Sequence, residues 1–114
     1  MRFGKAARLL RRREFLAVQQ QGQRLYGREL LVLALRSGKD RPRLGITVPG
    51  KVADSVTRNR VKRWVREAFR EVAGEWPPVD LVVVARGGCG EVGLEGARRA
   101  LGAARERLGS GGGR

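Results

Sequence analysis

Residues 58–70, RNRVKRWVREAFR, concentrate positive charge that could bind a polyanion. Six of these thirteen positions are Arg or Lys, and only Glu67 is acidic. At about 100° per residue in a helix, most of the polar side chains collect on one arc. The arc consists of Arg58, Asn59, Lys62, Arg63, Arg66 and Arg70, whereas Arg60 falls on the far side with Trp64, Glu67 and Glu71. Such a row of cations can donate hydrogen bonds to successive phosphates.

The charges on this arc favour a nucleic-acid partner over an ordinary solvated helix face. Arg58, Lys62 and Arg66 are four residues apart, a spacing at which like charges repel. Solvated helix faces usually mix acids with bases instead. The whole chain has the same bias, because 25 Lys and Arg against 11 Asp and Glu leave a formal charge of +14 on 114 residues. Phosphates would neutralise the repulsion, so we expect this helix to bind nucleic acid.

The chain lacks the side chains that a protein nuclease normally uses. It contains no histidine, and its eleven acids are scattered, whereas nuclease chemistry needs paired carboxylates or histidines. We therefore expect no independent active site on the protein. The single cysteine, Cys89, can form no internal disulfide or metal cluster, and no segment approaches the ~20 apolar residues of a membrane span. These features predict a cytoplasmic protein with no membrane association.

A long amphipathic helix must position the basic arc. Apolar residues at 61, 64, 65, 68, 69 and 72 form the stripe of a helix that lies on a core. Asp54 or Ser55 can cap its start, and Gly74 with the Pro77-Pro78 pair ends it.

Shorter patterns flank this helix. A first helix is predicted over 13–21, with Phe15, Leu16 and Val18 turned inward, and a brief strand near Leu25. Residues 29–36 and 43–48 read as strands joined in a hairpin, 80–86 as a further buried strand, and 94–108 as a last helix. We expect one domain over 1–114, with a flexible basic arm at 1–12 and a disordered glycine-rich tail at 109–114.

Two of these segments also carry a family resemblance. The run GITVPGKVADSVTRNRVKRWVREAFREV, followed by the strand DLVVVAR, resembles the bacterial ribonuclease P protein component. The resemblance implies an α/β (α+β) sandwich with a four-stranded mixed sheet and three helices in the order αβββαβα. It also implies a left-handed crossover at the RNR helix, against the usual handedness rule.

The resemblance further implies a subunit of an endoribonuclease whose chemistry belongs to its RNA. Mg²⁺ held by that catalytic RNA would activate the water that cuts the 5′ leader from precursor tRNA. The protein would bind the catalytic RNA and the 5′ leader, with no metal of its own and no obligate protein partner.

Carried over to this chain, the resemblance assigns residues to two sites. RNA contacts would come from the arc and its surroundings: Lys51, Arg58, Asn59, Arg60, Lys62, Arg63, Arg66 and Arg70, together with Arg11 and Arg12 of the arm. A leader-binding cleft between the first helix and the sheet would include Phe15, Gln19 and Leu33.

This chain departs from the family pattern in the cleft and in the loop before the RNR run. Gln19 and Leu33 stand where aromatic residues are common, so we expect leader affinity to depend more on charge and to fall more steeply with salt. Gly50, Ala53 and Asp54 make the loop less basic, so a phosphate or metal contact there is not expected.

Several alternatives remain open at this stage. Phe15 could be a plain core residue, Asn59 could reflect a helix-start preference, and Arg60 could pair with Glu67 or Glu71. For the whole chain, a ribosomal or other structural RNA-binding protein would share the charge and the small size. A DNA-binding module ranks third, because the arc offers few base-reading side chains.

Overall fold

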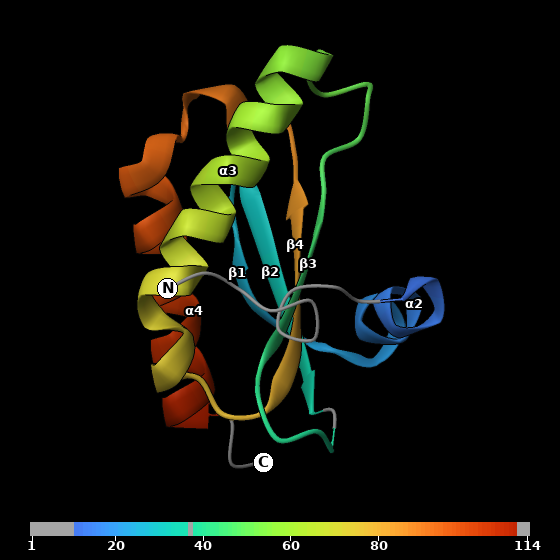
Figure 1. The fold of residues 1–114 in the computed structure, drawn as a ribbon, viewed down its shortest axis with the longest axis vertical. Helices are drawn as coiled ribbons and strands as arrows, with labels where there is room; N and C mark the ends of the chain where they lie inside the picture. The colour runs from blue at the N-terminus through green and yellow to red at the C-terminus, as the bar shows by residue number, and fades with distance from the viewer. Residues whose placement is uncertain (1–10, 37, 112–114) are drawn as a thin grey trace.

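A four-stranded sheet with helices on both faces makes up the molecule (Figure 1). The computed structural model describes residues 11–36 and 38–111. In chain order these form α2 (Arg12–Gln21), β1 (Gln23–Gly27), β2 (Leu30–Arg36), β3 (Arg43–Thr47), α3 (Ser55–Val72), β4 (Val79–Ala85) and α4 (Gly93–Gly111). Short 3₁₀ turns at Ala73–Glu75 and Cys89–Glu91 follow α3 and β4. The expected order αβββαβα is confirmed.

The sheet is mixed, as expected, but its strand order corrects the predicted hairpin. The order is β1-β2-β4-β3, with β2 antiparallel and β3 parallel to β4. Residues 29–36 and 43–48 are therefore not hairpin partners, because β4 lies between them. The physical reason is that β4 is buried along nearly its whole length, and a strand covered on both faces and both edges belongs in the middle of a sheet.

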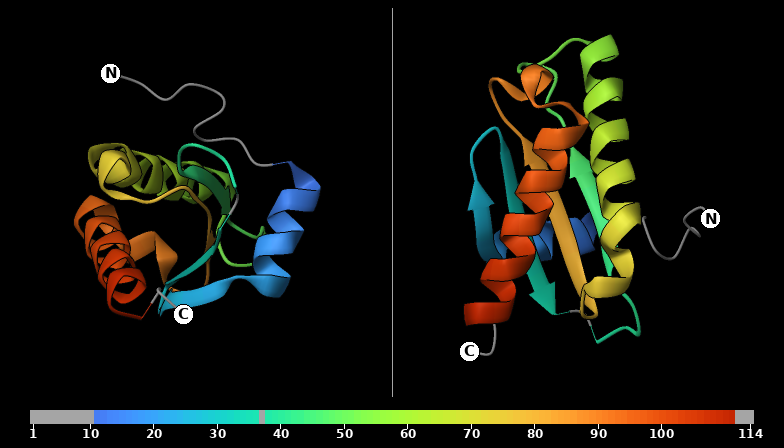
Figure 2. Two further views of the ribbon diagram at one scale, coloured as in Figure 1. Left: turned by 90° about the horizontal axis from the view of Figure 1, so that it is seen from below. Right: turned by 90° about the vertical axis from the view of Figure 1, so that its left-hand side faces the viewer.

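The connection from β3 to β4 through α3 is left-handed. In the right-hand view of Figure 2, α3 and α4 lie in front of the sheet, and the chain passes from β3 through α3 to β4 on its left. When two parallel strands point up and the connecting helix lies toward the viewer, a connection that leads to the strand on the left is left-handed, which is rare. The crossover expected from the resemblance is thus present.

Two apolar cores lie on the two faces of the sheet. The larger core packs α3 and α4 against alternate residues of the strands, among them Val32, Leu44, Leu81 and Val83. The smaller core lies under α2 and consists of Val18, Leu33 and Val82, with Phe15 packed against it. Figure 2 shows α2 alone on this face.

The ends of the chain and one side chain of α2 differ from expectation. Leu16 is 42% exposed rather than inward, because Phe15 and Val18, three residues apart, set the buried stripe of α2. Residues 1–10 of the predicted arm lie outside the described residues, as do 112–114 of the predicted tail, whereas α4 continues to Gly111, past the predicted end at Leu108. Arg12, assigned to the arm, is the first residue of α2.

Candidate nucleic-acid interface

The loop before α3 fixes where the basic helix begins. Asp54 is the N-cap, as predicted, and its side chain accepts a hydrogen bond from the Thr57 backbone N–H at 2.8 Å. That hydrogen bond is the main reason why the pKa of Asp54 is lowered. Lys51 lies exposed in this loop, close in sequence to the first turn of α3.

Burial of the apolar stripe fixes the rotation of α3. Val61, Val65, Ala68 and Phe69 are buried against the sheet and α4. The opposite side of the helix must therefore face solvent. Asn59, Arg60, Arg63, Arg66 and Arg70 are exposed, and Arg58 and Lys62 are half-buried.

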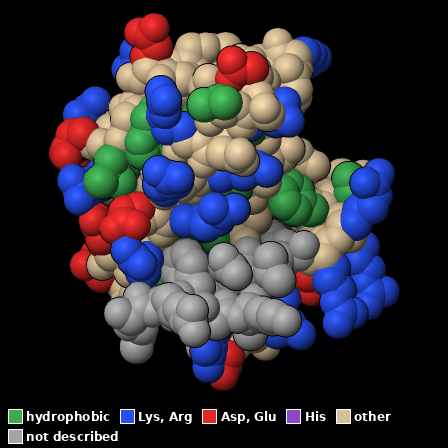
Figure 3. Space-filling model, turned by 45° about the horizontal axis from the view of Figure 1, so that its top comes forward, with side chains coloured by type: hydrophobic (Ala, Val, Ile, Leu, Met, Phe, Trp, Pro, Cys, Tyr) green, Lys and Arg blue, Asp and Glu red, His purple; other side chains and the backbone are tan. Residues whose placement is uncertain are grey.

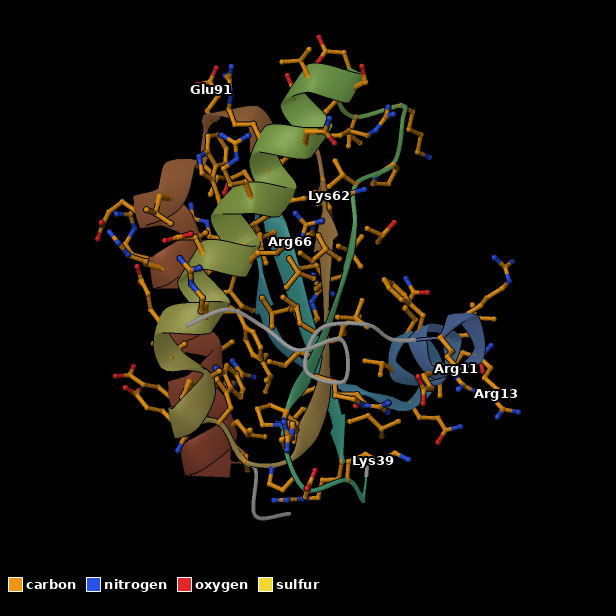
Figure 4. All side chains as sticks on the ribbon, in the orientation of Figure 1. Arg11, Arg13, Lys39, Lys62, Arg66 and Glu91 are labelled. Atoms are coloured by element: carbon orange, nitrogen blue, oxygen red, sulfur yellow. The ribbon has the colours of Figure 1, made fainter. Side chains whose placement is uncertain are left out.

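The basic residues of α3 lie on the surface of the molecule. Figure 3 shows Lys and Arg side chains gathered over the middle of this face, with Asp and Glu toward its margins. Figure 4 places Lys62 and Arg66 on successive turns of α3. We call the exposed row of Arg63 and Arg66 with the half-buried Arg58 and Lys62 the basic face.

Few of these cations form hydrogen bonds or ion pairs with other described groups of the protein. Arg58 donates a hydrogen bond from Nη1 to the Ala53 carbonyl oxygen at 3.3 Å, and Arg70 pairs with Glu67 at 2.6 Å. Within the part of the chain that the structure describes, no ion pair involves Lys62, Arg63 or Arg66. The basic face therefore presents uncompensated charge that an anion can neutralise.

The proposed ion pairs of Arg60 are absent among the described residues. Glu67 pairs with Arg70, and Glu71 receives two hydrogen bonds from Arg98 of α4, at 2.8 and 2.9 Å. The hydrogen bonds from Arg98 lower the pKa of Glu71. Arg60 remains exposed, so the reading of Arg60 as a structural ion pair is wrong.

On the other face of the sheet, α2 brings together part of the predicted cleft. Phe15 of α2 and Leu33 of β2 belong to one apolar cluster with Val18 and Val82. Phe15 is only half-buried there, so part of the residue remains accessible to solvent. Gln19 is exposed on α2. Arg11 and Arg12 are exposed at the start of the helix, and Figure 4 shows Arg11 and Arg13 on its surface.

Sequence reasoning missed an ion cluster beneath the start of α2. Arg43 of β3 donates to both carboxylate oxygens of Asp80 in β4, at 2.8 and 2.9 Å, and to Glu14 of α2 at 3.1 Å. The hydrogen bonds to Asp80 are the main cause of the raised pKa of Arg43. The available signal was Asp80, a lone charge in the apolar strand VDLVVVA, since a charge there requires a partner.

Neither a metal-binding cluster nor a membrane-spanning helix occurs among the described residues. In residues 11–36 and 38–111, no group of three or more Asp, Glu or Cys side chains is arranged to hold a metal ion. None of the described helices is both long and apolar enough to cross a membrane.

Comparison with known proteins gives one consistent result. Residues 3–109 match the family model described as Ribonuclease P. The ribonuclease P protein component of Shouchella clausii is 38% identical over 99 residues, which are 85% of this chain and 81% of that protein. The solved RNase P protein of Thermotoga maritima is 35% identical with a TM-score of 0.76, covering 88% of this chain and 96% of that one. That of Staphylococcus aureus is 26% identical with a TM-score of 0.79, covering 90% and 94%.

Proposed function

Because the chain belongs to the bacterial ribonuclease P protein family, we propose that it binds two parts of one RNA complex through the two faces of its sheet. The basic face of α3 binds the catalytic RNA of ribonuclease P. The surface between α2 and the sheet binds the single-stranded 5′ leader of precursor tRNA. The holoenzyme then removes the leader endonucleolytically and leaves the mature 5′ end of the tRNA.

The observation that carries the proposal is the uncompensated charge on α3. Lys62, Arg63 and Arg66 have no carboxylate partner among the described residues. They stand on a helix whose rotation is fixed by its buried stripe. A row of guanidinium and ammonium groups has the charge opposite to that of RNA phosphates, and its own repulsion is relieved when phosphates bind.

In the cleft, leader binding depends on base stacking as well as on charge. A single-stranded nucleic acid can stack one base on the exposed face of an aromatic ring without regard to sequence. Phe15 offers such a ring, half-buried on the apolar cluster. Leu33 and the exposed Gln19 provide no second ring beside it, so the cations at the start of α2, Arg11 and Arg12, must supply more of the affinity.

The chemistry in this proposal belongs to the RNA subunit. Mg²⁺ ions bound by that RNA supply the activated water, while this chain positions the leader and neutralises phosphates. A cytoplasmic location is part of the same proposal, since precursor tRNA is the substrate.

Single-turnover cleavage of a precursor tRNA by a bacterial ribonuclease P RNA at limiting Mg²⁺ tests the function. We expect the protein to stimulate cleavage and the Arg63→Ala, Arg66→Ala variant to lose most of that stimulation. The control variant Arg28→Ala, Arg99→Ala removes the same charge from exposed positions outside α3 and should stimulate normally. Affinity for the RNA should also depend less steeply on salt in the α3 variant. The slope of log affinity against log salt concentration should become shallower by about one unit per lost phosphate contact.

Two results would overturn the proposal. One is a folded wild-type protein that binds RNA but never changes cleavage by a cognate catalytic RNA, the behaviour of a structural RNA-binding protein. The other is equal loss of stimulation in the α3 variant and the control variant, which would mean that only net charge matters.

A further inference from the structure

A buried charge cluster connects the sheet to the first turn of α2. Asp80 is the one buried charged residue among those described, at 6% exposure. Arg43, its neighbour in the parallel register of β3 and β4, holds it with two charge-assisted hydrogen bonds of 2.8 and 2.9 Å. The same guanidinium reaches across to Glu14 at 3.1 Å.

Glu14 passes this connection on to the backbone of α2. Its second carboxylate oxygen accepts a hydrogen bond from the Arg11 backbone N–H at 2.7 Å. The Glu14 carboxylate therefore links the backbone of Arg11, the N-cap residue of α2, to the side chain of Arg43. Phe15, which packs against the smaller core, is the next residue along the helix, so the cluster holds the same turn of α2 that carries this ring.

The rest of α2 has little else to hold its first turn in place. Val18 is the single fully buried side chain that α2 contributes to the smaller core. At the far end, the Gly22 backbone N–H donates to the Val18 carbonyl oxygen at 2.8 Å, and a Cβ at Gly22 would lie 3.0 Å from the Ala34 carbonyl oxygen. That end is fixed by close backbone approach, whereas the first turn is held by the ion cluster together with the half-buried Phe15.

We propose that Arg43 is a positioning residue for leader binding. By bridging Asp80 and Glu14, it holds the first turn of α2, and with it Phe15, at a fixed height above β2 and β4. The inference rests on the proposed leader site. It adds that a side chain on β3, which need not touch RNA, sets how well that site is formed.

A double-mutant cycle between Arg43 and Glu14 tests the inference. Glu14→Gln keeps the side-chain shape and one acceptor but removes the charge that Arg43 binds. Arg43→Lys can still pair with Asp80, but it lacks the planar fork that reaches two carboxylates. The matched control is Glu95→Gln, which changes the net charge by the same amount and breaks the ion pair with Arg98 on α4.

The readout separates leader binding from all other RNA contacts. Each variant is assembled with a cognate ribonuclease P RNA, and the dissociation constant is measured for a precursor tRNA and for the same tRNA without its leader. Circular dichroism and urea denaturation check that every variant is folded. We expect Glu14→Gln and Arg43→Lys each to reduce the affinity gain from the leader about three- to tenfold, the range for loss of one ordinary protein hydrogen bond.

Further expectations make the positioning role specific. The double variant should lose no more than the larger single loss, because both changes break one connection. Affinity for the leaderless tRNA should stay unchanged, and Glu95→Gln should behave as wild type. An unchanged leader gain in folded Glu14→Gln, or losses that multiply in the double variant, would overturn the inference. If the wild-type holoenzyme gains no affinity from the leader at all, the proposed leader site itself is wrong, and this shows before any variant is compared.

Discussion

Removing Arg43 should destabilise the protein far more than removing an exposed arginine. The variant Arg43→Met keeps much of the side-chain length but leaves Asp80, with a side chain only 8% exposed, without its two hydrogen bonds. Breaking one partner of a buried ion pair costs roughly 3–5 kcal/mol, because the remaining charge stays buried and unpaired. A domain of this size has about 5–15 kcal/mol of stability in total. Arg43→Met should therefore be marginally folded.

A second substitution, at Asp80, should restore most of the stability lost in Arg43→Met. Arg43→Met combined with Asp80→Leu removes both charges of the pair and leaves Glu14, whose side chain is 24% exposed, partly solvated. Buried ion pairs replaced by apolar residues of similar volume are often neutral or stabilising. We expect the double variant to recover most of the loss, to within ~2 kcal/mol of wild type. The single change Arg98→Met, at an ion pair whose arginine is 43% exposed, should remain close to wild type.

Urea denaturation followed by tryptophan fluorescence measures these differences, since Trp76 is buried and Trp64 is partly buried in the larger core. The slope with denaturant should stay constant, so that midpoints report stability. A cost below ~1 kcal/mol for Arg43→Met, far under that of a broken buried pair, would refute the reasoning. So would a double variant no more stable than the single one, because the loss would then not come from an unpaired Asp80.

Three further predictions concern local features of the fold. Asp54→Ala removes the cap of α3 and should lower the melting temperature by roughly 5 °C, whereas Asp54→Asn retains an acceptor and should lower it less. Gly22→Ala would place a methyl group 2.4 Å from the Val18 carbonyl oxygen; we expect a loss of about 1–3 kcal/mol in urea denaturation, and an unchanged midpoint would contradict this packing. Glu14 should make α2 sensitive to acid, because hydrogen bonding to the backbone N–H at the helix start, aided by Arg43, lowers its pKa from 4.5. A group with a lowered folded-state pKa stabilises above its unfolded pKa and loses that contribution as the pH falls through the folded value, so the protection of α2 amides against exchange should fall in wild type as the pH drops below the ordinary glutamate pKa, and Glu14→Gln should remove this pH dependence.

The sequence alone was enough to locate the elements and the basic face. Hydrophobic spacing over 61–72 identified α3, and the last apolar position of that stripe is its observed last residue, Val72, because a stripe at helical period reports burial directly. Asp54 was recognised as a cap from local chemistry, since an N-cap needs only its own side chain and the first turn. The lack of acids on the arc is also visible in the sequence. In the structure, the arc lies on the solvent side of α3, as expected.

The predicted pairing of strands was wrong, because it depends on residues far apart in the sequence. The spacing of 29–36 and 43–48 suggested a hairpin, yet β4 enters between the two strands from more than thirty residues along the chain. Sequence neighbours often pair, but the most apolar strand gains most from the centre of a sheet. The left-handed crossover came only from the family resemblance, since general rules favour the opposite hand.

What the sequence determined by itself is the chemistry of the surface: a helix with cations on one side and a core stripe on the other, in a chain with no histidine. What only the tertiary structure decided is which distant charges meet. Asp80, Arg43 and Glu14 come from β4, β3 and α2, and they form one cluster only because β3 pairs in parallel with β4 under α2. The packing of α4 on α3 pairs Glu71 with Arg98, while Glu67 pairs with Arg70 within α3, and Arg60 stays exposed. The physical reason is that helix periodicity depends on residues a few positions apart, whereas ion pairs between elements depend on sheet order and helix placement, which are set by the burial of the whole core.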